Sequence, residues 1–299
     1  MKYVIISVLS WEERFIQGLK QNISNHPGSM LLMFKYNNPL THEWKKANLE
    51  ETRSLMEGKL VEVEIDPAKP YENWFIFRDR IVSNCKNSIV LVDITTMTRE
   101  AIWLTLYNCR LVSSETHFIY FRPQGYTTEW ISRDPGKPRL LYKMSGIAQL
   151  GLPTLLIVTG GYDIQRLDSL IYNFEPKTTI LYFQDSENER NRDIVEKCQE
   201  LFKSKYNVRL IYKYNPYDIQ KSYNQIVEKL SEIEIGTNGT YFDNYNIILN
   251  SLGAKTSALT LFKLWLNYPQ LALSYIPSKE YNKEYSYGTG EAYFGKVEE

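Results

Sequence analysis

Two patterns of apolar residues alternate along the chain. One is a short continuous run rich in β-branched and aromatic residues, and the other is a longer segment in which apolar residues return every three or four positions. The first pattern is typical of buried strands and the second of amphipathic helices. Strands that alternate with helices of about 10 to 15 residues predict βαβ units with right-handed crossovers and a mostly parallel sheet. The predicted fold class is therefore α/β.

The whole pattern occurs twice. Apolar runs begin at Lys2, Met30, Lys59, Ser88 and Thr116 in the first half, and at Pro153, Thr178, Val208, Asn246 and Leu271 in the second. Equivalent positions, such as Ser7 and Thr159, lie about 155 residues apart, and internal duplication is the simplest explanation of this constant separation. We therefore expect two tandem Rossmann-like three-layer units, residues 1–150 and 151–299, related by a pseudo-two-fold axis.

Three further segments carry predictions of their own. The spacing of apolar residues predicts helices over 71–83 and 217–233. Residues 137–151, with apolar positions between Pro138 and Pro153, predict a linking helix packed on the first half. The charged segment 186–205 predicts a solvated amphipathic helix.

Composition and charge exclude several classes of protein. The length of 299 residues suits two domains, and 43% hydrophobic with 23% charged residues is an ordinary globular balance. Because 35 Lys and Arg match 35 Asp and Glu, no overall field favours DNA or an anionic membrane. Direct DNA binding is not expected, and any recognition of phosphate must be local.

Cysteine and histidine usage points to a reducing compartment without a metal site. The three cysteines and three histidines are scattered, with no zinc-ligand spacing, so we expect no metal and a cytoplasmic location. The apolar run 3–9 is followed at once by Trp11, Glu12 and Glu13, which predicts a first strand rather than a signal peptide. No apolar stretch approaches the roughly 20 residues that span a bilayer, so no membrane partner is expected.

Loops at the carboxyl ends of parallel strands are the usual ligand sites of this fold class. The first pair of such loops follows the first strand of each half. Its candidate ligand-binding residues are Ser7, Ser10, Trp11, Thr159, Gly160 and Gly161. Glycine has no Cβ, so a Thr-Gly-Gly turn lets backbone N–H groups approach a ligand closely. A tight turn without any ligand needs the same glycines, and both interpretations stay open.

The second pair of loops lies between the fourth strand and the following helix of each half. Hydroxyl and amide groups converge there on the positive end of a helix, which favours an anion. The candidates are Asp93, Thr95, Thr96, Thr98, Arg99, Asn250, Ser251, Gly253, Lys255 and Thr256. A cation in the first turn opposes the helix dipole by a few tenths to about 1 kcal/mol, so Arg99 and Lys255 are easier to understand with a bound anion. In the alternative, Thr98 and Thr256 or Ser257 are plain N-caps and the basic side chains point into water.

The third pair of loops follows the last strand of each half and combines aromatic with basic residues. Arg122, Tyr126 and Tyr281 are the candidates, because such side chains can stack on a base and hold a phosphate. The chain is 14% aromatic, so surface loops also collect tyrosines without a ligand.

The common enzyme signatures of α/β proteins do not occur. There is no GxGxxG with an acidic partner, no Walker A, no HExxH and no GxSxG. Asp93 and Glu100 could form an acid/base pair, but the second half has Asn250 and Ser257 at those places. We assign no catalytic residue and no cofactor, and the question of enzymatic activity stays open.

The run SLGAKTSAL, which starts at Ser251 after the strand IILN, resembles the loop of the CARF family (CRISPR-associated Rossmann fold). That loop typically reads Thr-Gly-Gly-Thr-Lys before a helix. Gly253, Lys255 and Thr256 carry the resemblance, and the first-half run DITTMTREA keeps the hydroxyls without the glycine or the lysine. The resemblance implies a pair of fused CARF-like units, as in SAVED domains, whose loops bind a cyclic oligonucleotide messenger.

Together these features lead to one main expectation of function. The chain is expected to be a sensor that binds a nucleotide, such as a cyclic oligonucleotide, in a cleft between the two halves. Since no effector domain remains outside the two copies, it is expected to act through a separate effector protein in prokaryotic antiviral defence. The alternatives are a ring-nuclease-like or nucleotide-handling enzyme using the same cleft, and a non-binding structural subunit of a defence complex.

Overall fold

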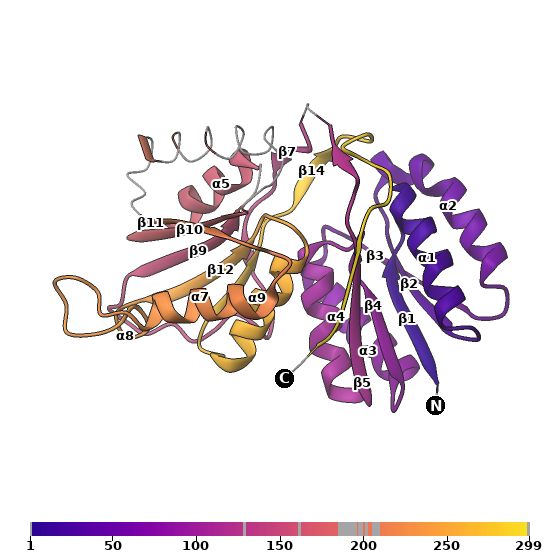
Figure 1. Ribbon diagram of the computed structural model, residues 1–299, viewed down its shortest axis with the longest axis horizontal. Coiled ribbons are helices and arrows are strands. Elements are labelled where there is room, and N and C mark those ends of the chain that lie inside the picture. Colours follow the sequence, from indigo (N-terminus) through magenta and orange to yellow (C-terminus); the bar gives the residue numbers. More distant parts are fainter. Residues whose placement is uncertain are drawn as a thin grey trace. The chain divides into compact units, whose positions relative to one another are not determined.

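The computed structural model describes residues 2–127, 130–160, 163–184, 196, 200, 203–204 and 210–297. The chain folds into two compact units (Figure 1). Unit 1 consists of Met1–Trp130 and Asn282–Glu298, and unit 2 consists of Ile131–Tyr281 and Glu299.

Unit 1 is built on a six-stranded sheet in the order β16-β5-β4-β1-β2-β3. Its strands are β1 (Tyr3–Val8), β2 (Met30–Tyr36), β3 (Leu60–Ile65), β4 (Ile89–Asp93), β5 (Glu115–Phe121) and β16 (Ala292–Lys296). All neighbouring strands run parallel except β16, which is antiparallel to β5. Most of the parallel strands are continuous apolar runs of the sequence, because a strand covered on both faces has no polar side to show. The edge strand β3, LVEVEI, instead alternates apolar with acidic residues and is only partly buried.

Helices cover both faces of the unit 1 sheet (Figure 1). They are α1 (Glu13–Asn25), α2 (His42–Leu55), α3 (Pro70–Cys85) and α4 (Arg99–Val112), with a short 3-10 turn at Pro39–Thr41. On α1, Phe15, Ile16 and Leu19 recur at helical spacing and pack with Ile5 and Leu31 of the sheet. Burying each such side chain stabilises the fold by roughly 1.5 to 3 kcal/mol.

Unit 2 repeats this plan with the order β11-β10-β9-β12-β13-β8. Its strands are β9 (Thr154–Gly160), β10 (Thr178–Gln184), β11 (Leu210–Tyr214), β12 (Asn246–Ser251), β13 (Ala272–Tyr275) and β8 (Arg139–Leu140). Its described helices are α5 (Ile164–Phe174), α7 (Ile219–Ser231), α8 (Tyr241–Asn244) and α9 (Thr256–Asn267). Again the strands are parallel except at one edge, where β8 is antiparallel to β13. The predicted fold class, two Rossmann-like units with mostly parallel sheets, is confirmed.

One of the two edge strands of each sheet comes from the other half of the sequence. In unit 2 it is β8, which follows the first five strands along the chain, and in unit 1 it is β16, near the end of the chain. Two short ladders repeat this exchange: β6 (Gly125–Tyr126) pairs with β15 (Ser286–Tyr287), and β7 (Ser132–Pro135) pairs with β14 (Ser278–Tyr281). For this reason the compact units do not coincide with the sequence halves 1–150 and 151–299.

The predicted linking helix over 137–151 is wrong, because this segment forms β8 and turns and belongs to unit 2. Leu141 N donates to Leu273 O over 3.0 Å, and Leu273 N donates to Met144 O over 2.8 Å. Gly146 has a φ of 67°, and a Cβ there would lie 2.4 Å from Gln270 O. The apolar residues of this segment therefore extend the sheet of unit 2 instead of forming a helical face.

The other two helix predictions differ in outcome. The helices expected over 71–83 and 217–233 are confirmed as α3 and α7. Most of segment 186–205 lies outside the described residues. Among the residues that are described, no helix combines the length and the apolar character that crossing a membrane requires.

Candidate functional site

The strand order reverses between β1 and β4 in unit 1 and between β9 and β12 in unit 2. In open α/β sheets this point, at the carboxyl edge, is where ligands bind. Each unit brings its own two candidate loops together there. Thr96 Oγ1 donates to Val8 O over 2.7 Å in unit 1, and Thr159 Oγ1 donates to Ser257 Oγ over 3.1 Å in unit 2. Each unit therefore has one candidate edge.

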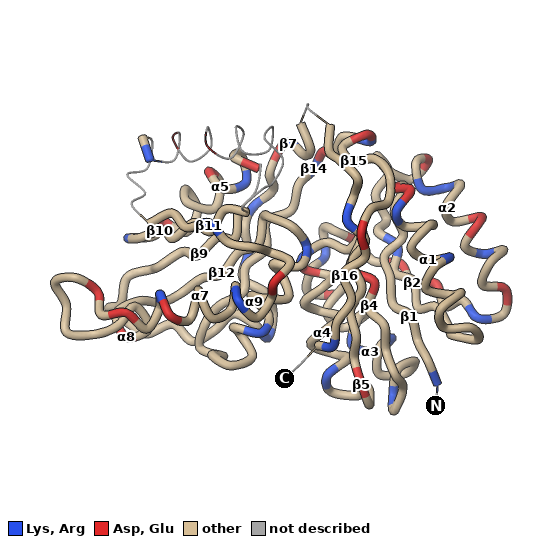
Figure 2. Tube along the Cα trace, in the orientation of Figure 1, with Lys and Arg blue, Asp and Glu red and all other residues tan. Residues whose placement is uncertain are grey.

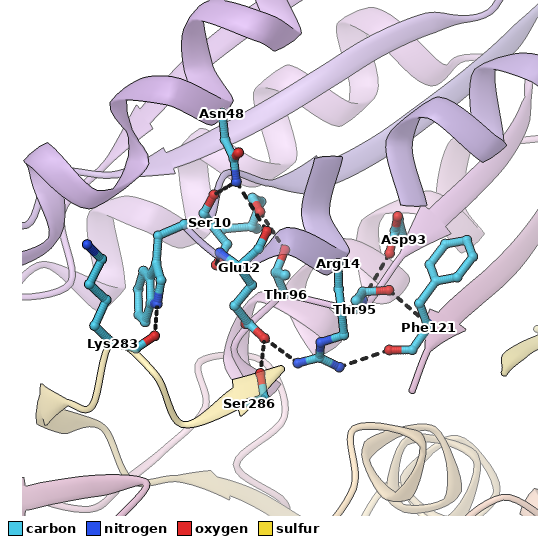
Figure 3. Close-up of polar contacts among 12 residues, drawn as sticks. Ser10, Glu12, Arg14, Asn48, Asp93, Thr95, Thr96, Phe121, Lys283 and Ser286 are labelled. Atoms are coloured by element: carbon cyan, nitrogen blue, oxygen red, sulfur yellow. Dashed lines mark hydrogen bonds and ion pairs between the residues drawn. The ribbon is translucent and has the colours of Figure 1, made fainter. Parts of the chain in front are cut away.

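At the unit 1 edge, the loop hydroxyls are used by the fold itself (Figure 3). Phe121 N donates to Thr95 Oγ1 over 3.0 Å, and Thr95 N donates to Asp93 Oδ1 over 3.0 Å. Asp93, only 3% exposed, also accepts a hydrogen bond from Asn22 Nδ2 over 3.0 Å. Asp93 thus orders the loop after β4 and ties it to α1.

Thr98 is the N-cap of α4. Its Oγ1 accepts from Ala101 N over 3.1 Å and lies 2.8 Å from Tyr36 Oη. The capping interpretation therefore holds for Thr98. It fails for the other half, where Lys255 is the N-cap of α9 and makes no side-chain cap bond. Ser257 Oγ instead donates to Ala254 O over 2.7 Å.

The first-strand loop of unit 1 is covered by a buried polar network that sequence reasoning missed (Figure 3). Arg14, 3% exposed, forms an ion pair with Glu12 and donates from Nη1 to Phe121 O over 2.9 Å. Ser286 Oγ donates to Glu12 Oε2 over 3.0 Å, and Trp11 Nε1 donates to Lys283 O over 2.9 Å. The C-terminal segment therefore closes this edge.

Neighbouring groups reinforce the closure. Asn48 Nδ2 donates to Ser10 O and Glu12 O over 2.8 and 3.1 Å, and Glu12 N donates to Ser10 Oγ over 3.2 Å. Ser7 is 2% exposed. Burial and the nearby Glu12 carboxylate raise the pKa of Tyr285 well above its ordinary value, so that its hydroxyl stays neutral. Ser7, Ser10 and Trp11 are thus part of a filled edge.

The unit 2 edge is held together by a close backbone approach. Leu252 N and Gly253 N both donate to Thr159 O, over 2.8 and 2.9 Å. A Cβ on Gly253 would lie 2.8 Å from Gly160 O and 3.0 Å from Tyr214 Oη. Only glycine fits at Gly253 without a shift of the backbone.

Hydroxyls at this edge are used unequally. Ser251 Oγ and Ser257 Oγ lie 2.8 Å apart, which links the end of β12 to the first turn of α9. Thr256, 1% exposed, has a buried Oγ1 for which the described part of the chain provides no hydrogen-bond partner. Lys255, beside it, is half-buried. The first turn of α9 therefore holds a desolvated hydroxyl and a basic side chain together.

Asn250 occupies the place that Asp93 has in unit 1, with a different task. Its Nδ2 donates to Ser274 O and Ser274 Oγ over 2.9 and 3.0 Å, which ties β12 to β13. Asn250 is 1% exposed and acts in the sheet rather than at its surface.

A second buried ion pair, also missed from the sequence, lies at the start of α5. Asp163, the N-cap of α5, accepts from Arg166 Nε over 2.7 Å and from Ser132 Oγ over 2.6 Å. Burial opposes ionisation of Asp163, but the Arg166 guanidinium and the Ser132 hydroxyl hold its pKa below the ordinary value. The sequence signal was an arginine in the first turn of the first helix of each half, at Arg14 and Arg166.

The third candidate pair is divided between the units. Arg122 and Tyr126 belong to unit 1, where Arg122 N donates to Glu291 O over 2.9 Å and Tyr126 pairs with Ser286. Tyr281 belongs to unit 2 and pairs with Ser132. Of the remaining candidates, Arg99 is the first residue of α4 and half-buried, and Gly161 lies outside the described residues.

Two general features frame these edges. Basic and acidic positions are interspersed along both units, in keeping with the balanced composition (Figure 2). Within the described ranges, no group of three or more His, Cys, Asp or Glu residues is placed to hold a metal ion.

Comparison with known proteins assigns the chain to no family. No family model matches the chain, and no curated protein matches it. One similar solved structure, from Pseudomonas aeruginosa, is described as a universal stress protein; it shares 10% identity over 92% of both chains with a TM-score of 0.28. Another, a functionally unknown protein of the same species, shares 10% identity over 91% of both chains with a TM-score of 0.27. At these TM-scores the likeness carries no argument, and the α/β class rests on the strand order.

Proposed function

We propose that this chain is a cytoplasmic sensor that binds an anionic nucleotide, of the cyclic oligonucleotide kind, at the carboxyl edge of the unit 2 sheet. The ligand-bound chain then acts on a separate effector protein, in the setting of prokaryotic antiviral defence. The observation that carries the proposal is the first turn of α9, where the buried Thr256 hydroxyl has no partner among the described residues and Lys255 is half-buried. Support for the ligand class comes from the resemblance of residues 251–259 to CARF loops.

The physical case begins with the cost of the Thr256 hydroxyl. A buried polar group without a hydrogen bond costs about 1 to 3 kcal/mol, so this arrangement is easier to understand if a ligand completes it. The N–H groups at the start of a helix have no intrahelical acceptor and carry positive polarity, which suits a phosphate. Gly253 also favours a site at this edge. Gly160 O lies too close for a Cβ at this position, so no side chain of residue 253 covers the loop.

Unit 1 does not offer the same opportunity. Thr95, Thr96 and Thr98 all have partners within unit 1. We therefore place the ligand at unit 2. The buried free thiols of Cys85 and Cys109 fit the reducing compartment that the proposal requires.

The test is a calorimetric titration of the full chain with cyclic oligoadenylates and, separately, with ATP. Lys255→Ala should weaken binding by about 1 to 3 kcal/mol if Lys255 meets a phosphate, with little change in thermal stability. Lys177→Ala is the matched control: Lys177 is exposed and lies at the opposite edge of the same sheet, just before β10. Its affinity should equal that of the wild type.

Native mass spectrometry of the freshly purified protein complements the titration by looking for a retained nucleotide. A protein that retains none and binds none of the probes contradicts the proposal. Conversion of a probe to a shorter product would show the enzymatic alternative, since a sensor needs only saturable binding.

A further inference from the structure

Two buried arginines occupy equivalent places in the two units. Arg14 lies in the first turn of α1 and Arg166 in the first turn of α5. Each is paired with a carboxylate at the N-cap of its helix, Glu12 in unit 1 and Asp163 in unit 2. The two arginines are about 150 residues apart, the separation that the internal duplication predicts.

The surroundings of the two arginines are duplicated as well. Ser286 of β15 donates to Glu12, and Ser132 of β7 donates to Asp163. Tyr120 and Tyr126 lie near Arg14, and Tyr275 and Tyr281 lie near Arg166; Tyr285 also lies near Arg14 and has no described counterpart at Arg166. The two serines are about 150 residues apart, and so are Tyr120 and Tyr275, and Tyr126 and Tyr281. A carboxylate, an arginine, a serine and two tyrosines therefore recur together in both units.

The two constellations differ in what the arginine does with its Nη atoms. In unit 1, Arg14 Nη2 donates to Glu12 Oε2 and Nη1 donates to Phe121 O. In unit 2, Arg166 binds Asp163 through Nε, and no described residue accepts a hydrogen bond from its Nη atoms. Its side chain is 11% exposed, so the guanidinium is largely buried but not sealed.

We propose that Arg166 binds an oxyanion, a phosphate or a carboxylate group, through its two Nη groups. Asp163 holds Nε, and Ser132 and the Arg166 N–H hold Asp163, so the guanidinium is fixed before the anion arrives. A guanidinium fork matches two oxygens of one anion, and such paired bonds are strong and geometrically specific. The site uses no atom of loop 251–257 and does not depend on the proposed function.

Asp163 also determines how the anion is held. Because this carboxylate balances the charge of Arg166, paired hydrogen bonds rather than net charge must hold the ligand. Arg166→Lys is therefore informative: it keeps the positive charge but removes the planar fork. A site that depended on charge alone would tolerate this substitution.

The first experiment titrates inorganic phosphate, and separately acetate, into the wild-type protein at constant ionic strength. Arginine side-chain signals are followed by ¹H–¹⁵N NMR. The Arg166 signals should shift and saturate, while those of Arg14, which is also buried but has both Nη atoms bonded, should not. Absence of a saturable Arg166 shift with both probes overturns the proposal, as does an equal shift of Arg14. The two probes separate phosphate from carboxylate as the preferred group.

The second experiment measures the dissociation constant of the better probe for three variants by the same titration, followed on backbone signals. Arg166→Lys should raise the dissociation constant at least about tenfold, a loss expected for a charge-assisted bidentate pair. Lys255→Ala should leave it unchanged. The reverse pattern would assign the anion to α9 and overturn the Arg166 site, whereas failure of the nucleotide titration leaves the Arg166 result standing. Arg110→Lys, on an exposed residue of unit 1, controls for the substitution itself.

Discussion

The loops that follow β4 and β12 have the same frame but use their polar groups differently. In unit 1, Thr95, Thr96 and Thr98 bond to Phe121, Val8 and Ala101, so the loop is complete without a ligand. In unit 2, Gly253 has no side chain and lies close to the backbone of Gly160. The buried Thr256 hydroxyl has no partner among the described residues. Among the described residues, the unit 1 loop has partners for all three threonine hydroxyls, whereas the unit 2 loop bonds Ser251 and Ser257 to each other and leaves the Thr256 hydroxyl without one.

The buried arginines show the same division. Arg14 places both Nη atoms on groups of its own unit, and Arg166 places neither on a described residue. Two independent features therefore favour unit 2 over unit 1 as the place of the proposed ligand. The following predictions test this comparison.

The largest effect is expected from Arg14→Met. This substitution leaves the Glu12 carboxylate buried without its partner, which costs about 3 to 5 kcal/mol in comparable cases. Urea denaturation should show a loss of this size in the free energy of unfolding. The double variant Glu12→Gln with Arg14→Met removes the stranded charge and should recover part of it. A loss below about 1 kcal/mol in the single variant would mean that unit 1 is not held closed by this pair.

A pH effect of intermediate size is expected from Lys45, which is 7% exposed and donates to Tyr36 O over 3.0 Å at the unit 1 edge. Burial lowers the pKa of Lys45 from 10.5 to about 8. Between these values the unfolded chain binds more protons than the folded one, so stability should rise with pH from about 8 to about 10.5. The rise should be on the order of 3 kcal/mol by denaturation at stepped pH. Lys45→Met should flatten it, and an equal rise in that variant would refute the assignment.

Gly253→Ala should destabilise unit 2 by about 1 to 3 kcal/mol, because a methyl group forced into a packed site displaces its neighbours. The neighbour here is backbone, Gly160 O, at 2.8 Å from the added Cβ. The equivalent position in unit 1 is Thr96, which carries a side chain without conflict. Thermal denaturation would measure the loss, and a neutral Gly253→Ala would show that the loop has room to move.

The smallest effects come from a matched pair of substitutions. Thr96→Val removes a hydrogen bond to Val8 O and should cost about 1 kcal/mol. Thr256→Val removes a hydroxyl without a described partner and should be neutral or stabilising by up to about 1 kcal/mol. Denaturation of both variants under one condition gives the comparison. Equal losses at both positions would mean that Thr256 is bonded in solution as Thr96 is.

Much of the fold was predictable because the apolar runs and their repetition are strong signals. The exchange of edge strands was not, because β8 contains only Arg139–Leu140 and β16 alternates exposed with half-buried residues. A strand of two residues has no periodicity, and β16 has no continuous apolar run. The partners of both strands are also distant in sequence. The segment around Leu141 and Met144 was misread for the same reason, since an apolar edge segment and an apolar helix face look alike over a few residues.

The candidate edges were predictable in position but not in state. The sequence contains Thr96 and Thr256 in the expected loops, yet only the structure shows that the Thr96 hydroxyl is bonded and that the Thr256 hydroxyl has no partner among the described residues. Arg14 and Arg166 were missed because arginine is expected at the surface. The equal spacing of the two arginines within the duplication was the one signal that could have found them.

Hydrogen–deuterium exchange of the full chain, with and without a cyclic oligoadenylate, tests the contrast between the two edges most directly. The N–H of Thr256, the first residue of α9, has no backbone acceptor in the described part of the chain, so a bound phosphate should slow exchange in the segment 251–258 that contains it. Residues 93–100 should not change, because the hydroxyls of Thr95, Thr96 and Thr98 are already bonded within unit 1. Slower exchange at 251–258 alone is the predicted result, whereas no change in either loop, or equal protection of both, would contradict the account.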